Sequence, residues 1–373
     1  RLPWFCFMIQ VGLVGVGPQW ERFRPALTRL RQPIHVEAVY DPVFARAETA
    51  ARDLDADPIQ GISALARRGN VEAILVMDPA WTRTAVLPLL ACQQKPVFFA
   101  PWPFSGRDRV NRRAPLHADS DNLIVPAMWR RFFPAAIRLQ ELFATEIGRP
   151  YEIEIDLAGR STSTTTDRQR AATAATGSTL ESLVGWLDFC RTLFRAFPIS
   201  ASVSQTPAPD DATAAADSFF EFRMEYPPLA ASNESFDTSQ ANTGRIRTAK
   251  LTLRQTDSSK TDTATEFVQE LLAGVRRPAL VTPTILTADS SRPWVPDIRL
   301  SCERGGAELS STTRISWQRT SAEPIRETLT ADRSEEEIML DIFCRRVVGG
   351  LVPVADLNDI IRPIQLVRSC VDL

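Results

Sequence analysis

Two glycines and one acid near the start of the chain have the types and spacing that bind a pyrophosphate and a ribose. Gly15 and Gly17 follow the apolar segment 8–14, and Asp41 closes a second apolar segment, 36–40. Gly15 would permit a tight turn, and Gly17 would let the backbone approach a pyrophosphate at the N-terminus of the next helix. Asp41 would accept hydrogen bonds from an adenosine ribose, which favours NAD over the 2′-phosphate of NADP.

The third glycine of this dinucleotide-binding pattern is missing. Trp20 occupies its place, where a small residue normally lets helix and strand pack closely. One interpretation of Gly15 and Gly17 is therefore a structural turn that binds nothing. The other is a dinucleotide site, which the order of strand, glycine turn, helix, strand and acid favours.

Glu181 and Asp188 are the carboxylates that could do acid–base chemistry. They stand at positions i and i+7 of the apolar segment 180–194, so on a helix they share a face. Either could then act as a general base for a substrate hydroxyl. A capping or solvated acid is the alternative interpretation, and the spacing alone does not decide between the two.

Alternating strands and helices would position the glycines and Asp41. Helical segments are predicted at 20–30, 45–54, 61–68 and 82–92, and further buried strands at 71–77 and 96–99. This alternation implies a parallel sheet with right-handed crossovers, and ligands then lie at the carboxyl ends of the strands. Those ends are near Gly15, Asp41, Asp78-Pro79 and Ala100–Pro103. We therefore expect an α/β Rossmann domain over residues 1–125.

Residues 126–373 are expected to form an α+β domain with a large, mainly antiparallel sheet. Since 373 residues exceed the roughly 250–300 at which single cores stop growing, a second domain is required. Helices are predicted at 130–144 and 180–194, strands at 151–157, 219–226, 247–254, 297–302 and 314–318, and loops at 160–176 and 204–217. One face of this sheet is left open by the helices and must be buried elsewhere.

The composition excludes several classes of partner. A formal net charge of −2 gives no electrostatic footprint for nucleic acid or an anionic membrane, and no apolar run reaches the ~20 residues of a membrane span. Six scattered cysteines without a Cys-x-x-Cys pair indicate reduced thiols in a cytoplasmic protein, and only two histidines make a metal site unexpected. We expect Met8 to be the natural start and 1–7 an upstream extension; the alternative, a secretory signal, lacks a cleavage site.

The chain resembles the glucose–fructose oxidoreductase / inositol dehydrogenase (Gfo/Idh/MocA) family. Seven segments carry the resemblance in the family's order: VGLVGVG (11–17), VEAVYDP (36–42), VEAILVMDPAW (71–81), QQKPVFFAPWP (93–103), RRFFPAAIRLQELFATEIGRPYEIEI (130–155), GSTLESLVGWLDFCRTLF (177–194) and EEEIMLDIFCRRVVGG (335–350). The resemblance implies hydride transfer between NAD(P) and a sugar or cyclitol, so a small sugar-like molecule is the expected ligand. It also implies a homo-oligomer, a dimer or tetramer, formed through the open face of the sheet.

The chain departs from the family at a position that the resemblance makes catalytic. The family has a Lys in a Glu-Lys-Pro motif after the strand at 96–99. This chain reads Pro101-Trp102-Pro103 there, or Ala100-Pro101 in a second alignment, and Lys95 lies at the opposite end of the strand. Trp102 is either an aromatic platform for the nicotinamide or sugar, in place of the charge, or a filler of the vacated volume.

The family's Asp and His, four residues apart in the later helix, are also replaced. Alignment on Asp188 puts Glu181 in the place of the Asp and Gly185 in the place of the His. Alignment on Trp186 gives Ser182 and Trp186 instead. Both alignments leave the usual acid–base pair absent.

Asp78 bears on whether a cofactor binds. It stands before Pro79, where the family usually has a small hydroxyl residue, and its charge would repel a pyrophosphate unless it is paired. We therefore expect an NAD(P)-binding oxidoreductase-type protein that is catalytically impaired, a pseudoenzyme, with Glu181 or Asp188 as the remaining base. The alternatives are a non-catalytic nucleotide- or sugar-binding regulator and a structural partner subunit, neither of which requires a bound cofactor.

Overall fold

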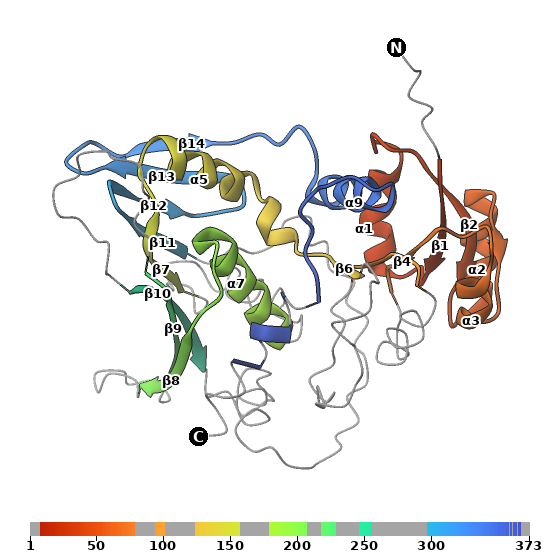
Figure 1. The fold of residues 1–373 in the computed structure, drawn as a ribbon, viewed down its shortest axis with the longest axis horizontal. Coiled ribbons are helices and arrows are strands. Elements are labelled where there is room, and N and C mark those ends of the chain that lie inside the picture. Colours follow the sequence, from red (N-terminus) through yellow and green to blue (C-terminus); the bar gives the residue numbers. More distant parts are fainter. Residues whose placement is uncertain are drawn as a thin grey trace, which may run out of the picture. The chain divides into compact units, whose positions relative to one another are not determined.

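A computed structural model describes residues 8–78, 94–100, 124–156, 179–206, 218–228, 246–255 and 297–357, together with 359, 361–363, 365 and 366. Contacts between Cα atoms divide the chain into two compact units (Figure 1). The first unit comprises Arg1–Phe132 with Asp332–Ile361, and the second comprises Phe133–Ala331 with Arg362–Leu373.

This division differs from the expected boundary between residues 125 and 126. Helix α9 (Glu335–Val347), near the end of the chain, belongs to the first unit and not to the second. Its apolar stripe explains the difference, because Met339, Leu340 and Phe343 are buried in the core of the first unit. The Phe343 ring lies 5.6 Å from the Phe98 ring of the sheet, centroid to centroid.

The described strands of the first unit form a parallel sheet, which confirms the Rossmann expectation. Their order is β3-β2-β1-β4-β5-β6, so β1 lies between β2 and β4. Their bounds are Ile9–Val14 for β1, Ile34–Tyr40 for β2, Asp57–Pro58 for β3, Ala73–Val76 for β4, Val97–Phe99 for β5 and Ile124–Pro126 for β6. The short strands β3 and β6 were not predicted from the sequence.

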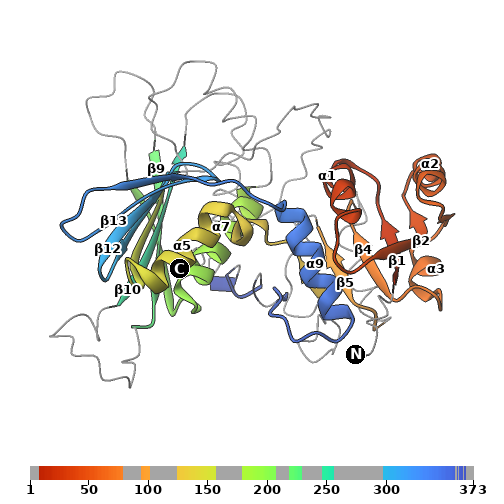
Figure 2. The ribbon, with the colours of Figure 1, turned by 90° about the horizontal axis from the view of Figure 1, so that it is seen from above.

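Helices pack on both faces of this sheet, as a parallel sheet requires. One face is covered by α1 (Pro18–Leu27), α2 (Phe44–Leu54) and α9, whose buried side chains share one core with the strands. The other face is covered by α3 (Ile62–Arg67), through Leu65 and Ala66. Figures 1 and 2 both show α1 and α9 side by side.

The described strands of the second unit form a large, mostly antiparallel sheet, which confirms the expected α+β architecture. Their order is β14-β13-β12-β11-β7-β10-β9-β8, and only the described pair β7 and β10 is parallel. Their bounds are Pro150–Asp156 for β7, Ser200–Thr206 for β8, Ser218–Tyr226 for β9, Arg247–Gln255 for β10, Asp297–Cys302 for β11, Gly305–Leu309 for β12, Arg314–Arg319 for β13 and Ile325–Thr328 for β14.

The two faces of the second sheet differ in polarity. The helices α5 (Pro134–Thr145) and α7 (Thr179–Phe194) lie on one face (Figure 2). The strands alternate, so one cross-strand row is apolar and buried: Phe222, Leu251, Ile155, Ile298 and Leu309. The neighbouring row, on the opposite face, is charged: Arg223, Lys250, Glu154, Arg299 and Glu308. The open face is therefore polar.

Two expectations for the second unit were wrong in detail. The helix expected over 130–144 is interrupted: a 3₁₀ turn, Trp129–Phe132, precedes α5, and Phe133 between them has an extended ψ of 135°. Phe133 precedes Pro134, and the proline ring disfavours the helical conformation of the residue before it. The loop expected from 204 is wrong as far as Thr206, because these residues end β8, an edge strand without apolar alternation.

Candidate functional site

The turn after β1 has the backbone that the glycine pattern predicts. Gly15 has a φ of +85°, in the left-handed region that favours glycine. Its N–H donates to the carbonyl oxygen of Tyr40 at 2.7 Å, so the turn is bound to the end of β2. A β-carbon at Gly15 would lie 1.8 Å from the carbonyl oxygen of Asp78. Both the backbone angle and the close approach of Asp78 therefore require glycine here.

The second glycine of the turn lies against a carboxylate. Gly17 is the residue before α1, which begins at Pro18. A β-carbon at Gly17 would lie 1.8 Å from Oδ2 of Asp78. The Asp78 carboxylate thus packs directly on the Cα of Gly17, at the N-terminus of α1. That is the place where a pyrophosphate was expected.

Asp41 is held by the backbone on both of its oxygens. Oδ2 accepts from the N–H of Val16 at 3.0 Å, and Oδ1 accepts from the N–H of Val43 at 2.8 Å. Its exposed fraction is 5%. The carboxylate therefore connects the turn after β1 to the turn after β2. A ribose could reach only the lone pairs that these two bonds leave.

The bond from Asp41 to Val43 is a local one that the sequence could have indicated. An Asp followed by Pro42 favours an Asx-turn, in which the side chain accepts from the N–H two residues on. The bond from Val16, 25 residues away, has no such signal. A ribose was the predicted partner of Asp41, and neither backbone amide was predicted.

Trp20, in the place of the third glycine, is a core residue. Its exposed fraction is 2%, and it belongs to the same cluster as Phe23 and the inward-facing residues of β1. The Phe23 ring packs edge-on against Phe98 at 5.5 Å. The apolar packing of α1 on the sheet is therefore built around a large indole, where the dinucleotide pattern has a small residue.

Of the two candidate bases, Asp188 is placed where it cannot act on a ligand from solvent. Its exposed fraction is 1%, and Oδ1 lies 3.4 Å from a guanidinium nitrogen of Arg191. The pKa of the neighbouring Cys190 thiol is raised well above its usual range, mainly because the thiol is buried and to a smaller extent because of the negative charge of Asp188. Glu181 is in the first turns of α7, but its side chain is outside the described residues.

The structure brings four of the expected cofactor residues together: Gly15, Gly17, Asp41 and Asp78. Pro79 and Trp102 are outside the described residues. The backbone of the turn fits a dinucleotide, but the side chains as placed do not. The Asp78 carboxylate fills the place on Gly17 where a phosphate was expected, and Asp41 accepts the Val16 amide.

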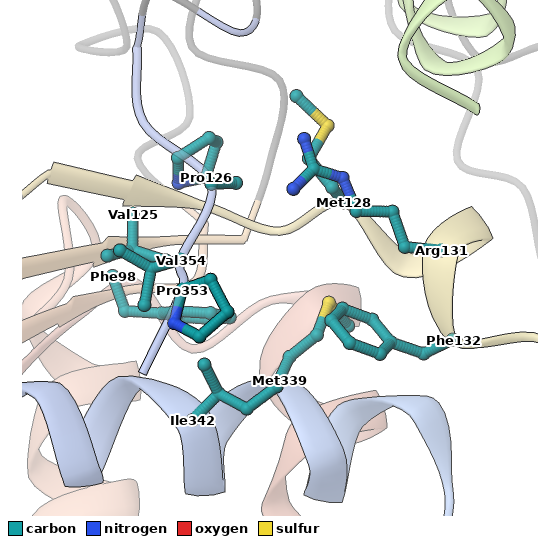
Figure 3. Close-up of a pocket in the computed structure, with 11 residues that line it drawn as sticks. Phe98, Val125, Pro126, Met128, Arg131, Phe132, Met339, Ile342, Pro353 and Val354 are labelled. Carbon is teal, nitrogen blue, oxygen red and sulfur yellow. The ribbon is translucent and has the colours of Figure 1, made fainter. Parts of the chain in front are cut away.

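A pocket in the first unit offers a second candidate site. It contains about 320 Å³ of empty space, part of it open to solvent. Figure 3 shows Phe98 and Val125 of the sheet facing Met339 and Ile342 of α9, with Pro353 and Val354 beside them. The pocket has one cation in its wall, Arg131, which pairs with Asp359 at 2.9 Å.

This pocket carries no chemistry of its own. Its wall is almost entirely apolar, and the Arg131 guanidinium is already engaged by a carboxylate. None of the residues of the glycine turn is among its lining residues. We interpret it as loose packing beneath the segment that follows α9.

Two further searches cover only the described part of the chain. There, no group of three or more His, Cys, Asp or Glu side chains is arranged to hold a metal ion. No described helix combines the length and apolar character needed to cross a membrane.

Comparison with known proteins finds similarity in structure alone. No protein-family model matches the chain, and no curated protein matches it. Solved structures match over 98% of the chain. One is UDP-N-acetylglucosamine 3-dehydrogenase from Acidithiobacillus ferrooxidans, with a TM-score of 0.60, 14% identity and 98% of that chain covered. This chain shares its fold.

Two other structures extend the comparison. A dehydrogenase from Chromobacterium violaceum matches with a TM-score of 0.65 and 16% identity, over 95% of that chain. Biliverdin reductase from Synechocystis, solved with biliverdin and NADP⁺, matches with a TM-score of 0.60 and 11% identity, over 98% of that chain. At these identities the comparison establishes the two-domain fold and leaves the ligand and the reaction to be argued from the residues.

Proposed function

We propose that the chain is an NAD(P)-binding protein of the sugar and cyclitol oxidoreductase type, with weak dinucleotide binding and little or no turnover. The observation that carries the proposal is the turn after β1, where Gly15 takes the left-handed conformation and α1 begins at once behind Gly17. This backbone is the one that lets a pyrophosphate approach a helix N-terminus. Similar folds include a UDP-sugar dehydrogenase and a reductase solved with NADP⁺, which supports a nicotinamide cofactor.

Low turnover follows from the candidate bases. Asp188 is buried and paired with Arg191, so Glu181 is the base that remains for a substrate hydroxyl. General acid–base catalysis contributes roughly 10²- to 10⁴-fold to a rate, and the family's lysine and histidine are replaced as well.

Titration with NADH and NADPH tests the proposal. Energy transfer from tryptophan to the reduced nicotinamide reports binding, and we expect saturation at high micromolar to millimolar concentrations. Turnover would then be screened with sugars and cyclitols. A complete lack of binding at millimolar NADH and NADPH would refute the proposal and favour the structural partner subunit.

A non-catalytic regulator is the second candidate, because Asp188 is unavailable and Asp78 lies on the phosphate turn. The two candidates differ in turnover and not in binding. If the protein binds NADH but turns over none of the sugars and cyclitols tested, the regulator is the better description. A loss of activity in E181Q would instead identify Glu181 as the base.

We also propose that the open face of the second sheet pairs two or more copies of the chain. The exposed charges on that face are of both signs, and within one chain Lys250 lies 2.9 Å from Glu221 and Arg299 lies 3.7 Å from Glu308. Such a face would form a polar interface, weakened by salt. Light scattering should therefore show an oligomer at low ionic strength that dissociates in about 1 M salt. A monomer at every salt concentration would contradict this.

A further inference from the structure

The position of Asp78 is fixed by the sheet and not by a mobile loop. It follows β4, whose end pairs with the end of β1 through Val14 and Val76. The N–H groups of Met77 and Asp78 both donate to the carbonyl oxygen of Val14, at 2.8 and 3.3 Å. These bonds hold the Asp78 backbone beside Gly15, and its carboxylate reaches Gly17.

Two donors of the turn are used within the protein. The Gly15 amide donates to Tyr40 and the Val16 amide donates to Asp41. Pro18, the first residue of α1, has no N–H to offer. A pyrophosphate at this turn would thus meet fewer available amides than the glycine pattern promises, and it would meet the Asp78 carboxylate.

A carboxylate at the N-terminus of a helix is stabilised by the helix dipole for the same reason that a phosphate is. A carboxylate and a phosphate cannot both fill one such place, so a phosphate bound there must displace the Asp78 carboxylate from Gly17. The carboxylate and a pyrophosphate therefore compete for the N-terminus of α1.

We infer that Asp78 sets the affinity of this turn for phosphate-bearing ligands, by occupying with its own carboxylate the place on Gly17 that a pyrophosphate needs. The inference rests on the proposed function, since it explains why dinucleotide binding is weak. It makes Asp78 a specificity-determining residue: it selects against phosphate and leaves neutral parts of a ligand unaffected.

Neutralising Asp78 tests the inference. NADH and NADPH are titrated against the native chain, D78N and D78S, with adenosine as a ligand that lacks phosphate. D53N is the matched control, because Asp53 is an exposed acid near the end of α2 and its loss changes the net charge equally. We expect D78N and D78S to bind both dinucleotides on the order of tenfold to a hundredfold more tightly, with D53N and adenosine binding unchanged.

The outcomes separate this inference from the proposed function. Equal NADH affinity in the native chain and in both Asp78 variants overturns the inference and leaves the proposed function standing. Tight binding by the variants with none by the native chain supports the inference and refutes the proposed function. Failure of all variants to bind refutes both. An equal gain for adenosine and NADH also overturns the inference, because the gain would not concern phosphate.

A measurement without ligand guards against misfolded variants. Replacing Gly17 by Ala places a β-carbon on Oδ2 of Asp78, and D78S removes that atom. The inference requires G17A to lower the thermal midpoint more in the native background than in the D78S background. Equal losses in the two backgrounds would show that the carboxylate does not lie on Gly17, and would overturn the inference.

Discussion

Replacing Asp41 by Ala should destabilise the first unit, whatever it does to a ligand. The carboxylate accepts two backbone N–H groups, from Val16 and Val43, and its exposed fraction is 5%. A buried donor left without an acceptor costs roughly 1–3 kcal/mol. Both bonds are only part-buried and Val43 is 49% exposed, so water can reach the freed amides, and we expect about 1–3 kcal/mol for the two bonds together.

Hydrogen exchange measured by mass spectrometry gives a local readout of this loss. Peptides that contain the Val16 and Val43 amides should lose protection in D41A, while urea denaturation gives the change in the free energy of unfolding. The control is D53A, whose exposed carboxylate lies 3.4 Å from Arg24 and should contribute less than about 1 kcal/mol. If D41A weakened NADH binding but left both unfolding and exchange unchanged, Asp41 would be a ribose ligand and our account of it would be wrong.

Three further predictions follow from the described contacts. Replacing Gly15 by Ala should lower the thermal midpoint and reduce the free energy of unfolding by about 3 kcal/mol or more. The control is Ala at Gly61, where the nearest atom to the new β-carbon would be 4.0 Å away; it should cost less than about 1 kcal/mol. The hydrogen bond from Arg138 lowers the pKa of Glu327. The ionised carboxylate therefore stabilises the second unit when the pH is above the ordinary pKa of a glutamate, and this stabilisation is lost as the pH falls through the lowered pKa. The unfolding midpoint of E327Q should accordingly vary less than that of the native chain between pH 7 and pH 3, the usual range of carboxylate titration being roughly pH 3–5. Burial raises the thiol pKa of Cys190, Cys302 and Cys344, and it raises that of Cys302 and Cys344 to about 12. A thiol reagent at about pH 8 should therefore label these three cysteines only after unfolding, which peptide mapping would show.

The architecture could be predicted because local periods carry it. Strands such as Ile9–Val14 and Asp297–Cys302 show clear apolar patterns, and the alternation of elements implies the parallel sheet. Short or polar edge strands such as Ile325–Thr328 show no such pattern, so they were missed. The packing of Glu335–Val347 on the first unit was not predicted. An apolar stripe shows that a helix is buried on one side, but it does not show which sheet the helix packs against.

The candidate site shows a sharper limit. Spacing placed Gly15, Gly17, Asp41 and Asp78 at one edge of the sheet, and the structure brings all four together. The direction of a carboxylate is a different matter, because an acid at the end of a strand has the same spacing whether it accepts a ribose hydroxyl or a backbone amide. For Asp41 the backbone amides were the partners, and for Asp78 the neighbouring glycine was the contact.

The position of α9 in the first unit has a consequence for how the chain matures on the ribosome. The segment 332–361 leaves the ribosome about 200 residues after Phe132, and at synthesis rates of 5–20 residues per second this delay is roughly 10–40 s. Throughout that interval Phe98 lacks the Phe343 ring that later packs on it, so an apolar surface of the sheet stays uncovered. We therefore expect the nascent first unit to expose a chaperone-binding apolar surface until the last helix emerges.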